Sequence, residues 1–498
     1  MRDKAKKSMS NKLRFVMTAI ISALMMAVAM AQPITADDVP KKVVEAAEVY
    51  RNGDANKALA LFEELVEVAP ENPDVLSWLG FLYIQRDDFT KAIPVLERAK
   101  GVRANDLEIL NNLGNAYVAV GRDDEALGLY SSITELNTRM YEPWYNIGGI
   151  HLRKRNYDAA IGAFDKAISL YGQDPFVYNN LGIAWEGKGN NEKSSEAFLK
   201  AVELRPDNVT FNRNAGVALL RQGQVDKAVP YLEKSMADED PMTALALGEI
   251  YAAQGRNEDA AKMFELAEEG NGQNAVYWYN VGILKARLNQ NDEAVAAYEK
   301  SLELNGNQPE VLNNLGLLHY RQRNYEKALL AFEAQAKLQP NSVDVLQNCA
   351  ATQVQLGKKD EAFKLWLQIL QRDPNKVDAR LNVAATYWDR GGKQNREQAR
   401  FHFVEALKRE PRNPRALNGI GLYQYEDNRL DQAVESFRRA IAADRSFLPA
   451  YNNLAVTLER QNKRAEAIRT LEMALEIDPN YEDAKKNLAR MKQSTRKS

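Results

Sequence analysis

Small and large apolar residues recur along the chain with a spacing of 34 residues. A small residue marks each repeat, and in most repeats a second small residue follows twelve positions later and a large apolar residue four positions after that. Periods of about 20–50 residues are typical of proteins in which each repeat buries its apolar face against its neighbours. The first small positions are Ala46, Gly80, Gly114, Gly148, Gly182, Gly216, Gly248, Gly282, Gly316, Ala350, Ala384, Gly421 and Ala455.

If each of these residues is the eighth of its repeat, the apolar spacing predicts two helices per repeat. Small residues at the eighth and twentieth positions let the two helix backbones approach where they cross. The large residue at the twenty-fourth position, such as Phe164, is expected to fill the gap between neighbouring pairs. Proline ends several repeats because it cannot continue a helix, and a following asparagine caps the next helix, as in Pro340-Asn341.

This pattern resembles the tetratricopeptide repeat family. The stretches from Leu113 to Ile133 and from Leu315 to Pro340 fit the family pattern closely. The resemblance implies an all-α fold, a right-handed superhelical solenoid of about thirteen helix-turn-helix repeats over residues 39–479. Residues 480–498 are expected to form a capping helix and a tail, with the helix running from Tyr481 to about Lys492.

Two repeats depart from the period. Gly216 and Gly248 are 32 residues apart, and Pro374 and Pro411 are 37 residues apart, with the excess around Gly391. Residues 269–272 are also expected to be loose. Two explanations stay open: simple variation in loop length, or a hinge near residues 238–275. Such a hinge would divide the array into residues 39–240, with repeats one to six, and residues 241–479, with repeats seven to thirteen.

The first 31 residues differ from the rest of the chain. A basic head is followed by an uncharged, mostly apolar run from Phe15 to Ala31, which ends in the small-x-small pattern of a signal peptidase site. We expect residues 1–31 to be a signal peptide that is cleaved after Ala31, with a retained membrane anchor as the alternative. Cleavage implies export, either to a periplasm or to the outside of the cell.

The charge balance bears on the partners. The chain of 498 residues has 66 Lys and Arg against 68 Asp and Glu, and removal of residues 1–31 takes away six basic residues and one acidic residue. The mature protein is therefore acidic and lacks the basic face that displaces counterions from phosphates. We expect no nucleic-acid partner, and membrane contact only through an uncleaved signal.

Candidate catalytic and metal-binding residues are few. One cysteine, Cys349, excludes an internal disulfide framework and a thiolate metal site, and the three histidines are scattered. His151 and His319 take a position held by tyrosine in other repeats, and Cys349 takes one held by leucine, so all three are expected to pack within their repeats. His402 lies on a second helix with no acidic or histidine partner set by the pattern. We therefore predict a non-enzyme without a metal or cofactor.

The sixth position of the repeat carries asparagine in nine of thirteen repeats. The family resemblance implies that this position points into the concave face formed by the first helices. An amide side chain offers one acceptor and two donors, so an asparagine ladder can pair with the peptide groups of an extended polypeptide. The alternative is hydrogen bonding between repeats that stiffens the stack. The ladder residues are Asn112, Asn146, Asn180, Asn214, Asn280, Asn314, Asn348, Asn382 and Asn453, with Asn111, Asn179, Asn313, Asn418 and Asn452 at the fifth position beside them.

This ladder resembles the asparagine array of the O-linked N-acetylglucosamine transferase, whose tetratricopeptide groove binds extended polypeptide. The resemblance covers the repeats alone, and no transferase activity is implied. A stripe of arginines lies seven residues beyond the ladder, where it can clamp carboxylates or carbonyls of a bound chain or simply pair with neighbouring glutamates. These arginines are Arg153, Arg221, Arg287, Arg321 and Arg460.

Two hypotheses for function follow from the sequence. The first is a protein-interaction scaffold of the cell envelope, which binds extended segments of protein or peptide partners in the groove. The second is a structural subunit of an envelope export, pilus or polysaccharide-secretion assembly, which contacts folded partners through its convex face or its ends. Self-association is compatible with both.

Overall fold

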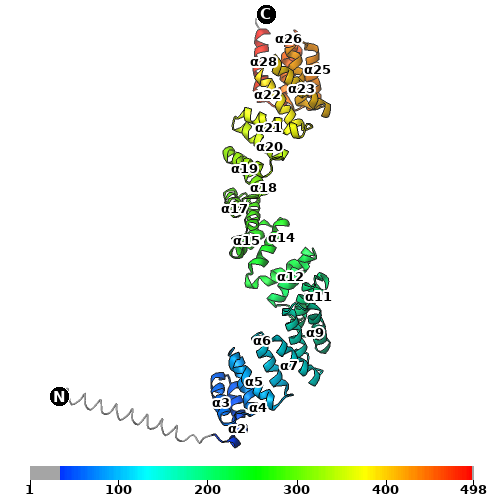
Figure 1. Ribbon diagram of the computed structural model, residues 1–498. Helices are drawn as coiled ribbons and strands as arrows, with labels where there is room; N and C mark the ends of the chain where they lie inside the picture. Colours follow the sequence, from blue (N-terminus) through cyan, green and yellow to red (C-terminus); the bar gives the residue numbers. More distant parts are fainter. Residues whose placement is uncertain (1–33, 496–498) are drawn as a thin grey trace, which may run out of the picture. The chain divides into compact units, whose positions relative to one another are not determined.

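A computed structural model describes residues 34–495 (Figure 1). Over these residues the chain forms the α-helices α2 to α28 and two short 3-10 helices, η1 (Ala36–Asp38) and η2 (Met236–Asp238), with no β-strand. The prediction of an all-α fold is confirmed. The expected signal peptide lies outside the described residues. The chain divides into two compact units between Thr243 and Ala244, in the first turn of α14 (Pro241–Ala253).

The first unit is a row of six helical hairpins, in which the two helices of a pair pack against each other and the second helix packs on the next pair. The hairpins are α2 (Val39–Arg51) with α3 (Ala55–Val68), α4 (Pro73–Ile84) with α5 (Phe89–Val102), α6 (Leu107–Ala119) with α7 (Asp123–Leu136), α8 (Glu142–Arg153) with α9 (Tyr157–Leu170), α10 (Pro175–Gly187) with α11 (Asn191–Leu204), and α12 (Val209–Arg221) with α13 (Val225–Ser235).

The second unit continues with seven hairpins and a last helix, α28 (Glu482–Thr495), which packs on α26 and α27 as the predicted cap. The thirteen predicted repeats are thus all present in the described chain. The hairpins are α14 with α15 (Asn257–Asn271), α16 (Ala275–Arg287) with α17 (Asn291–Leu304), α18 (Pro309–Arg321) with α19 (Tyr325–Leu338), α20 (Val343–Gln355) with α21 (Lys359–Arg372), α22 (Val377–Arg390) with α23 (Lys393–Arg409), α24 (Pro414–Glu426) with α25 (Leu430–Ala443), and α26 (Leu448–Arg460) with α27 (Arg464–Ile477).

The turn inside each hairpin contains a residue with a positive φ angle at the fifteenth position of the repeat. In α6 the N–H of Gly121 donates to the carbonyl of Val118, and the N–H of Arg122 donates to that of Tyr117. These bonds satisfy carbonyls that the helix end leaves unpaired. A fixed turn of this kind sets the second helix against the first in every repeat. The residues with a positive φ angle at this position are Gly53, Asp87, Gly121, Arg155, Gly189, Gly223, Gly255, Asn289, Arg323, Gly357, Gly391, Asn428 and Asn462.

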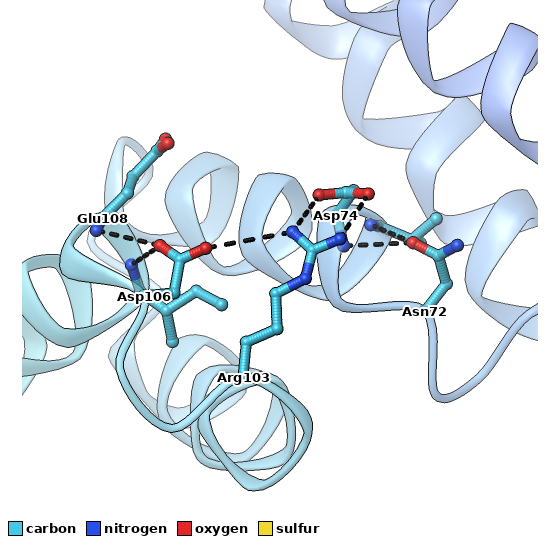
Figure 2. Close-up of polar contacts among 7 residues, drawn as sticks. Asn72, Asp74, Arg103, Asp106 and Glu108 are labelled. Carbon is cyan, nitrogen blue, oxygen red and sulfur yellow. Dashed lines mark hydrogen bonds and ion pairs between the residues drawn. The ribbon is translucent and has the colours of Figure 1, made fainter.

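Side-chain caps and ion pairs hold the loops between hairpins, as Figure 2 shows for the loop from α5 to α6. Asn72 accepts a hydrogen bond from the N–H of Asp74 at 3.0 Å, and Asp106 accepts one from the N–H of Glu108 at 3.0 Å. The guanidinium of Arg103 donates to both carboxylate oxygens of Asp74, at 2.6 and 3.1 Å, and lies 3.9 Å from Asp106. Because these groups are exposed, the pair orients the loop more than it stabilises the fold.

The large residue of each repeat lies over the small residue of its own first helix. A Cβ atom built on Gly148 would lie 2.5 Å from the ring of Phe164, which is itself fully buried. The large residue therefore lies at the crossing point within its hairpin, and Phe164 also packs in one core with Val177 and Leu181 of the next pair, where it was expected to fill the gap. The same contact joins Gly80 to Leu96, Gly114 to Tyr130, Gly182 to Phe198, Gly216 to Leu232, Gly282 to Tyr298, Gly316 to Phe332 and Gly421 to Phe437.

The two irregular repeats differ in length from the others because their second helices are shorter or longer than usual. Helix α13 has 11 residues and passes into η2, whereas α23 has 17 residues and begins directly after Gly391 and Gly392. The expectation of a loose segment at 269–272 is wrong, because α15 continues to Asn271, whose buried side chain donates to the carbonyl of Ala267 at 2.9 Å. Whether residues 238–275 act as a hinge stays a prediction.

Over residues 34–495 no helix is both long enough and apolar enough to cross a membrane.

Candidate functional site

The predicted ladder residues lie on the first helices of the hairpins, and their side chains are partly buried. First helices of successive repeats pack side by side, for example α8 with α10 in the first unit and α24 with α26 in the second. In the first unit the ladder runs over α6, α8, α10 and α12. In the second it runs over α16, α18, α20, α22 and α26.

Most ladder amides donate a hydrogen bond to the fifth-position residue of the preceding repeat, 35 residues earlier in the chain. These bonds link each first helix to the one before it, which is the stiffening role that the sequence left open. An amide that donates one such bond has a second N–H and an oxygen for other partners, and the oxygen of Asn180 accepts from Asn179 at 3.4 Å. The bonds run from Asn180 to the Tyr145 hydroxyl at 3.3 Å, from Asn214 to Asn179 at 2.8 Å, from Asn314 to the Tyr279 hydroxyl at 3.3 Å, from Asn348 to Asn313 at 3.3 Å and from Asn453 to Asn418 at 2.9 Å.

The ladder extends one step beyond the residues that sequence reasoning singled out. Asn487 in α28 donates to Asn452 at 2.7 Å with the same spacing of 35 residues. Asn487 stands 34 residues after Asn453, so extending the 34-residue period into the capping helix would have predicted it as a ladder residue. The cap therefore copies the polar face of a first helix as well as covering the apolar end of the array.

The other ladder positions have different surroundings. The side-chain nitrogen of Asn112 is buried with no hydrogen-bond partner, and Asn146 makes no side-chain hydrogen bond within the described chain. Asn280 donates to Glu249 at 2.8 Å, and Asn382 accepts from Arg415 at 2.7 Å. In α24 the ladder position is Gly419, because a Cβ atom there would lie 2.4 Å from the ring of Phe403.

A hollow of about 290 Å³ opens among α6, α8 and α10. It brings together three predicted site residues, Asn146, Arg153 and Asn180. Gly149 leaves room on one side, since a Cβ atom built there meets nothing within 4 Å. The other lining residues are Asn115, Val118, Ala119, Tyr130, Tyr145 and Ile150.

The arginine stripe is largely engaged with the preceding repeat. Arg153 pairs with Asp123 and Arg221 with Glu186. Arg287 donates to the carbonyl of a residue 35 positions earlier at 2.7 Å, and Arg460 does the same at 3.3 Å. Arg321 forms no ion pair among residues 34–495. These contacts match the alternative that the arginines pair with neighbouring groups, although Arg153 stays half-exposed at the hollow.

The inter-repeat bond predicts a difference between two alanine variants. We expect Asn214→Ala to lower the free energy of unfolding by about 1 kcal/mol more than Asn146→Ala does, because a hydrogen bond between repeats is lost in the first variant alone. Both changes alter helix propensity equally, so the difference isolates the bond. Urea unfolding followed by circular dichroism, with amide exchange in α10 and α12, measures it. Equal stability of the two variants would contradict the stiffening role.

His319 and Cys349 are buried in the protein interior, whereas His151 and His402 are partly buried. Cys349 is 3% exposed, and burial raises the pKa of its thiol to about 11. Burial lowers the pKa of His402 to about 4, and its ring stacks on that of Tyr387 with centroids 5.8 Å apart. The sequence pattern did not show this aromatic partner. Over residues 34–495 no cluster of three or more His, Cys, Asp or Glu side chains is arranged to hold a metal ion.

Comparison with protein families finds tetratricopeptide profiles along most of the chain. Profiles described as tetratricopeptide repeat match residues 49–109, 111–175, 180–241, 243–274, 309–342, 389–447 and 424–491, and one described as TPR repeat matches residues 284–323.

Curated relatives match over a short stretch. Proteins named probable UDP-N-acetylglucosamine–peptide N-acetylglucosaminyltransferase SPINDLY, from Petunia hybrida and Arabidopsis thaliana, are 41% identical over 56 residues. The match covers 11% of this chain and 6% of each relative, so this chain spans only a small part of their length. The stretch consists of repeats and includes no catalytic domain.

Solved structures align over more of the chain at low identity. A tetratricopeptide repeat protein from Parabacteroides merdae is 19% identical, with 50% of this chain and 99% of that chain covered and a TM-score of 0.38. The Cut9–Hcn1 hetero-tetramer of APC/C is 14% identical, with 94% and 98% covered and a TM-score of 0.36. MamA from Desulfovibrio magneticus is 22% identical, with 33% and 93% covered and a TM-score of 0.31.

Proposed function

The chain belongs to the tetratricopeptide repeat family, and on this basis we propose that it is a non-enzymatic scaffold that binds an extended polypeptide segment along its first helices. The family fold is a protein-interaction scaffold and is generally non-catalytic. The observation that supports the proposal most is the hollow among α6, α8 and α10. Of the two ladder amides that line it, Asn146 makes no side-chain hydrogen bond in the described chain, whereas Asn180 donates to the Tyr145 hydroxyl of the preceding repeat.

The chemistry of this site suits a peptide backbone. A peptide group presents one N–H and one carbonyl, and an asparagine amide can pair with both. The amide of Asn146, which lines the hollow and makes no side-chain hydrogen bond in the described chain, supplies such groups. Arg153 at the edge of the hollow has a half-exposed guanidinium, which suits a carbonyl or an acidic side chain of the bound segment. Recognition of this kind reads the backbone and tolerates many sequences.

A second candidate function rests on the second helices. Leu330 in α19 is 67% exposed, and Phe401 in α23 is 52% exposed. Exposed apolar side chains of this size are common at protein interfaces. They favour a structural subunit that meets a folded partner with the opposite face of the hairpins, as in an envelope export, pilus or polysaccharide-secretion assembly.

We also propose that the protein acts after export. The basic head, the apolar run to Ala31 and the small-x-small ending are what support this location, whether it is a periplasm or the extracellular space. Mass spectrometry of the protein recovered from the envelope fraction tests it, since cleavage as proposed yields a chain that begins at Gln32. An N-terminal peptide that retains residues upstream of Ala31 would contradict cleavage.

A pull-down from envelope extract tests the groove. We expect the mature wild-type protein to retain partners that Asn146→Ala/Arg153→Ala loses at least tenfold, because the variant removes an amide and a guanidinium that line the hollow. Quantitative mass spectrometry of the bound proteins gives the ratio. Circular dichroism confirms that both baits are folded.

The matched control is Leu330→Ala/Phe401→Ala, which alters the second helices and leaves the ladder intact. Partners lost with the Asn146→Ala/Arg153→Ala variant and kept with this control place recognition on the first helices. Partners kept with that variant and lost with the control refute the groove proposal and favour the second candidate.

A further inference from the structure

The second unit contains a cavity that no part of the proposed groove uses. It has a volume of about 700 Å³ and lies among α15, α16 and α17. None of the ladder asparagines or stripe arginines lines it. The lining residues are Ala261, Lys262, Phe264, Glu265, Glu268, Tyr277, Trp278, Val281, Leu284, Lys285, Glu293, Ala296, Ala297 and Lys300.

The cavity exists because α15 lacks two large apolar side chains that most second helices carry. At the twenty-first position of the repeat, ten of the thirteen repeats have a large apolar residue, and α15 has Ala261. At the twenty-eighth position most repeats are again apolar, and α15 has Glu268. The large apolar residues are Leu59, Ile93, Leu127, Ile161, Val229, Val295, Leu329, Phe363, Val434 and Ile468 at the first position, and Val66, Ile168, Val202, Met236, Leu302, Leu370, Leu407, Ile441 and Leu475 at the second.

In the other repeats these side chains fill the space between the second helix and its neighbours. Ile161, Leu329 and Phe363 are 7%, 7% and 6% exposed and belong to the apolar cores of their hairpins. The smaller side chain of Ala261 leaves a space beside α15, which costs stability unless another group fills it.

The walls of the cavity are apolar and aromatic. Phe264, Tyr277 and Leu284 are 3%, 2% and 1% exposed. The two polar groups on these rings are already bonded to the backbone: the Tyr277 hydroxyl donates to the carbonyl of Phe264 at 2.7 Å, and the Trp278 indole N–H donates to that of Gly272 at 2.8 Å. An occupant therefore finds no free hydrogen-bond donor on these rings and gains most from burying apolar surface.

The charges at the mouth of the cavity select against an anion. Lys285 is paired with Glu293 at 2.5 Å, and Lys300 is paired with Glu303 at 2.8 Å. The remaining charged groups of the lining are two carboxylates, Glu265 and Glu268, and the single cation of Lys262. A negatively charged group on the occupant would meet an excess of like charge.

We propose that this cavity is a binding site for a small, uncharged aromatic molecule. Its volume falls in the range of about 300–1,000 Å³ found for small-molecule sites, which are mostly apolar, with aromatic walls and few polar groups. Trp278 is the partly exposed aromatic residue of the lining and favours a ring contact with the occupant. This site is independent of the proposed polypeptide groove, so the protein can carry two ligands of different classes.

Two matched fluorescent probes test the site in the full mature chain. N-phenyl-1-naphthylamine is uncharged, and 1-anilinonaphthalene-8-sulfonate carries the same ring system with an added sulfonate. We expect saturable binding of the uncharged probe at one site, with a dissociation constant at least tenfold lower than that of the sulfonate. No saturable binding of the uncharged probe, or tighter binding of the sulfonate, overturns the proposal.

A filled-cavity variant locates the binding. Ala261→Ile/Glu268→Leu restores the apolar residues that other repeats carry at these positions, so we expect a higher melting temperature and at least tenfold weaker binding of the uncharged probe. Ala261→Ile alone serves the same purpose if the double variant does not fold. The control Lys100→Leu makes a similar change at the equivalent position of α5, away from the cavity, and should bind the probe like the wild type.

Three results contradict the assignment. Unchanged probe binding by the filled variant places the probe elsewhere, and equal weakening by Lys100→Leu shows a general effect on the array. A wild-type dimer that the filled variant turns into a monomer, seen by sedimentation, would show that a second copy of the chain occupies the cavity.

Discussion

Gly148→Leu is expected to destabilise the hairpin of α8 and α9 by about 3 kcal/mol. Its Cβ atom would lie 2.5 Å from the ring of Phe164, a distance that real Cβ contacts do not reach. Because Phe164 is fully buried, its ring has no solvent-side space into which it can turn. Overpacking of this kind costs typically about 1–3 kcal/mol, and here the extra atoms separate two helix backbones. Amide exchange in α8 and α9, together with urea unfolding, measures the loss.

The neighbouring residue supplies the control. A Cβ atom on Gly149 meets nothing within 4 Å, so Gly149→Leu adds the same side chain to the same helix without a clash. Leucine also favours the helix over glycine by somewhat less than about 1 kcal/mol, so this variant should be as stable as the wild type or slightly more stable. Equal destabilisation by the two substitutions would contradict the packing register of the repeat.

Phe437→Ala is expected to cost about 3–5 kcal/mol, the usual loss for a fully buried phenylalanine. Its side chain lies over Gly421 and packs in the core that includes Tyr451 and Leu454. The control is Phe401→Ala, since Phe401 is 52% exposed and its removal should change the free energy of unfolding by less than about 0.5 kcal/mol. Urea unfolding followed by circular dichroism compares the two variants.

The region in which amide exchange becomes faster distinguishes a local loss of packing from a destabilisation of the whole array. Each repeat of a solenoid contacts only its neighbours, so lost packing at Phe437 should raise amide exchange mainly in α24 to α27. Exchange in α2 to α9 should remain that of the wild type. Uniform loss of protection along the chain, or a large effect of Phe401→Ala, would show that the core is not organised repeat by repeat.

Much of the fold follows from the sequence, because it depends on short-range rules repeated many times. The spacing of Gly148 and Ala160, kept from repeat to repeat, predicted two helices per repeat and the positions where they cross. The same register predicted thirteen hairpins and a capping helix. Helix periodicity and close approach at small residues act within one repeat, so a single 34-residue pattern is enough to specify them.

The roles of the polar residues required the tertiary structure. Sequence spacing placed Asn214 and Asn179 in neighbouring repeats, but the packing of α12 on α10 brought their amides to 2.8 Å and turned the ladder into a set of bonds between repeats. Helix packing also left the side-chain nitrogen of Asn112 buried without a hydrogen-bond partner. The cavity beside Ala261 arose in the same way, since a missing side chain opens a space only when neighbouring helices do not close over it. Local pattern determines which residues face one another, and the distance between them is set by how whole helices pack.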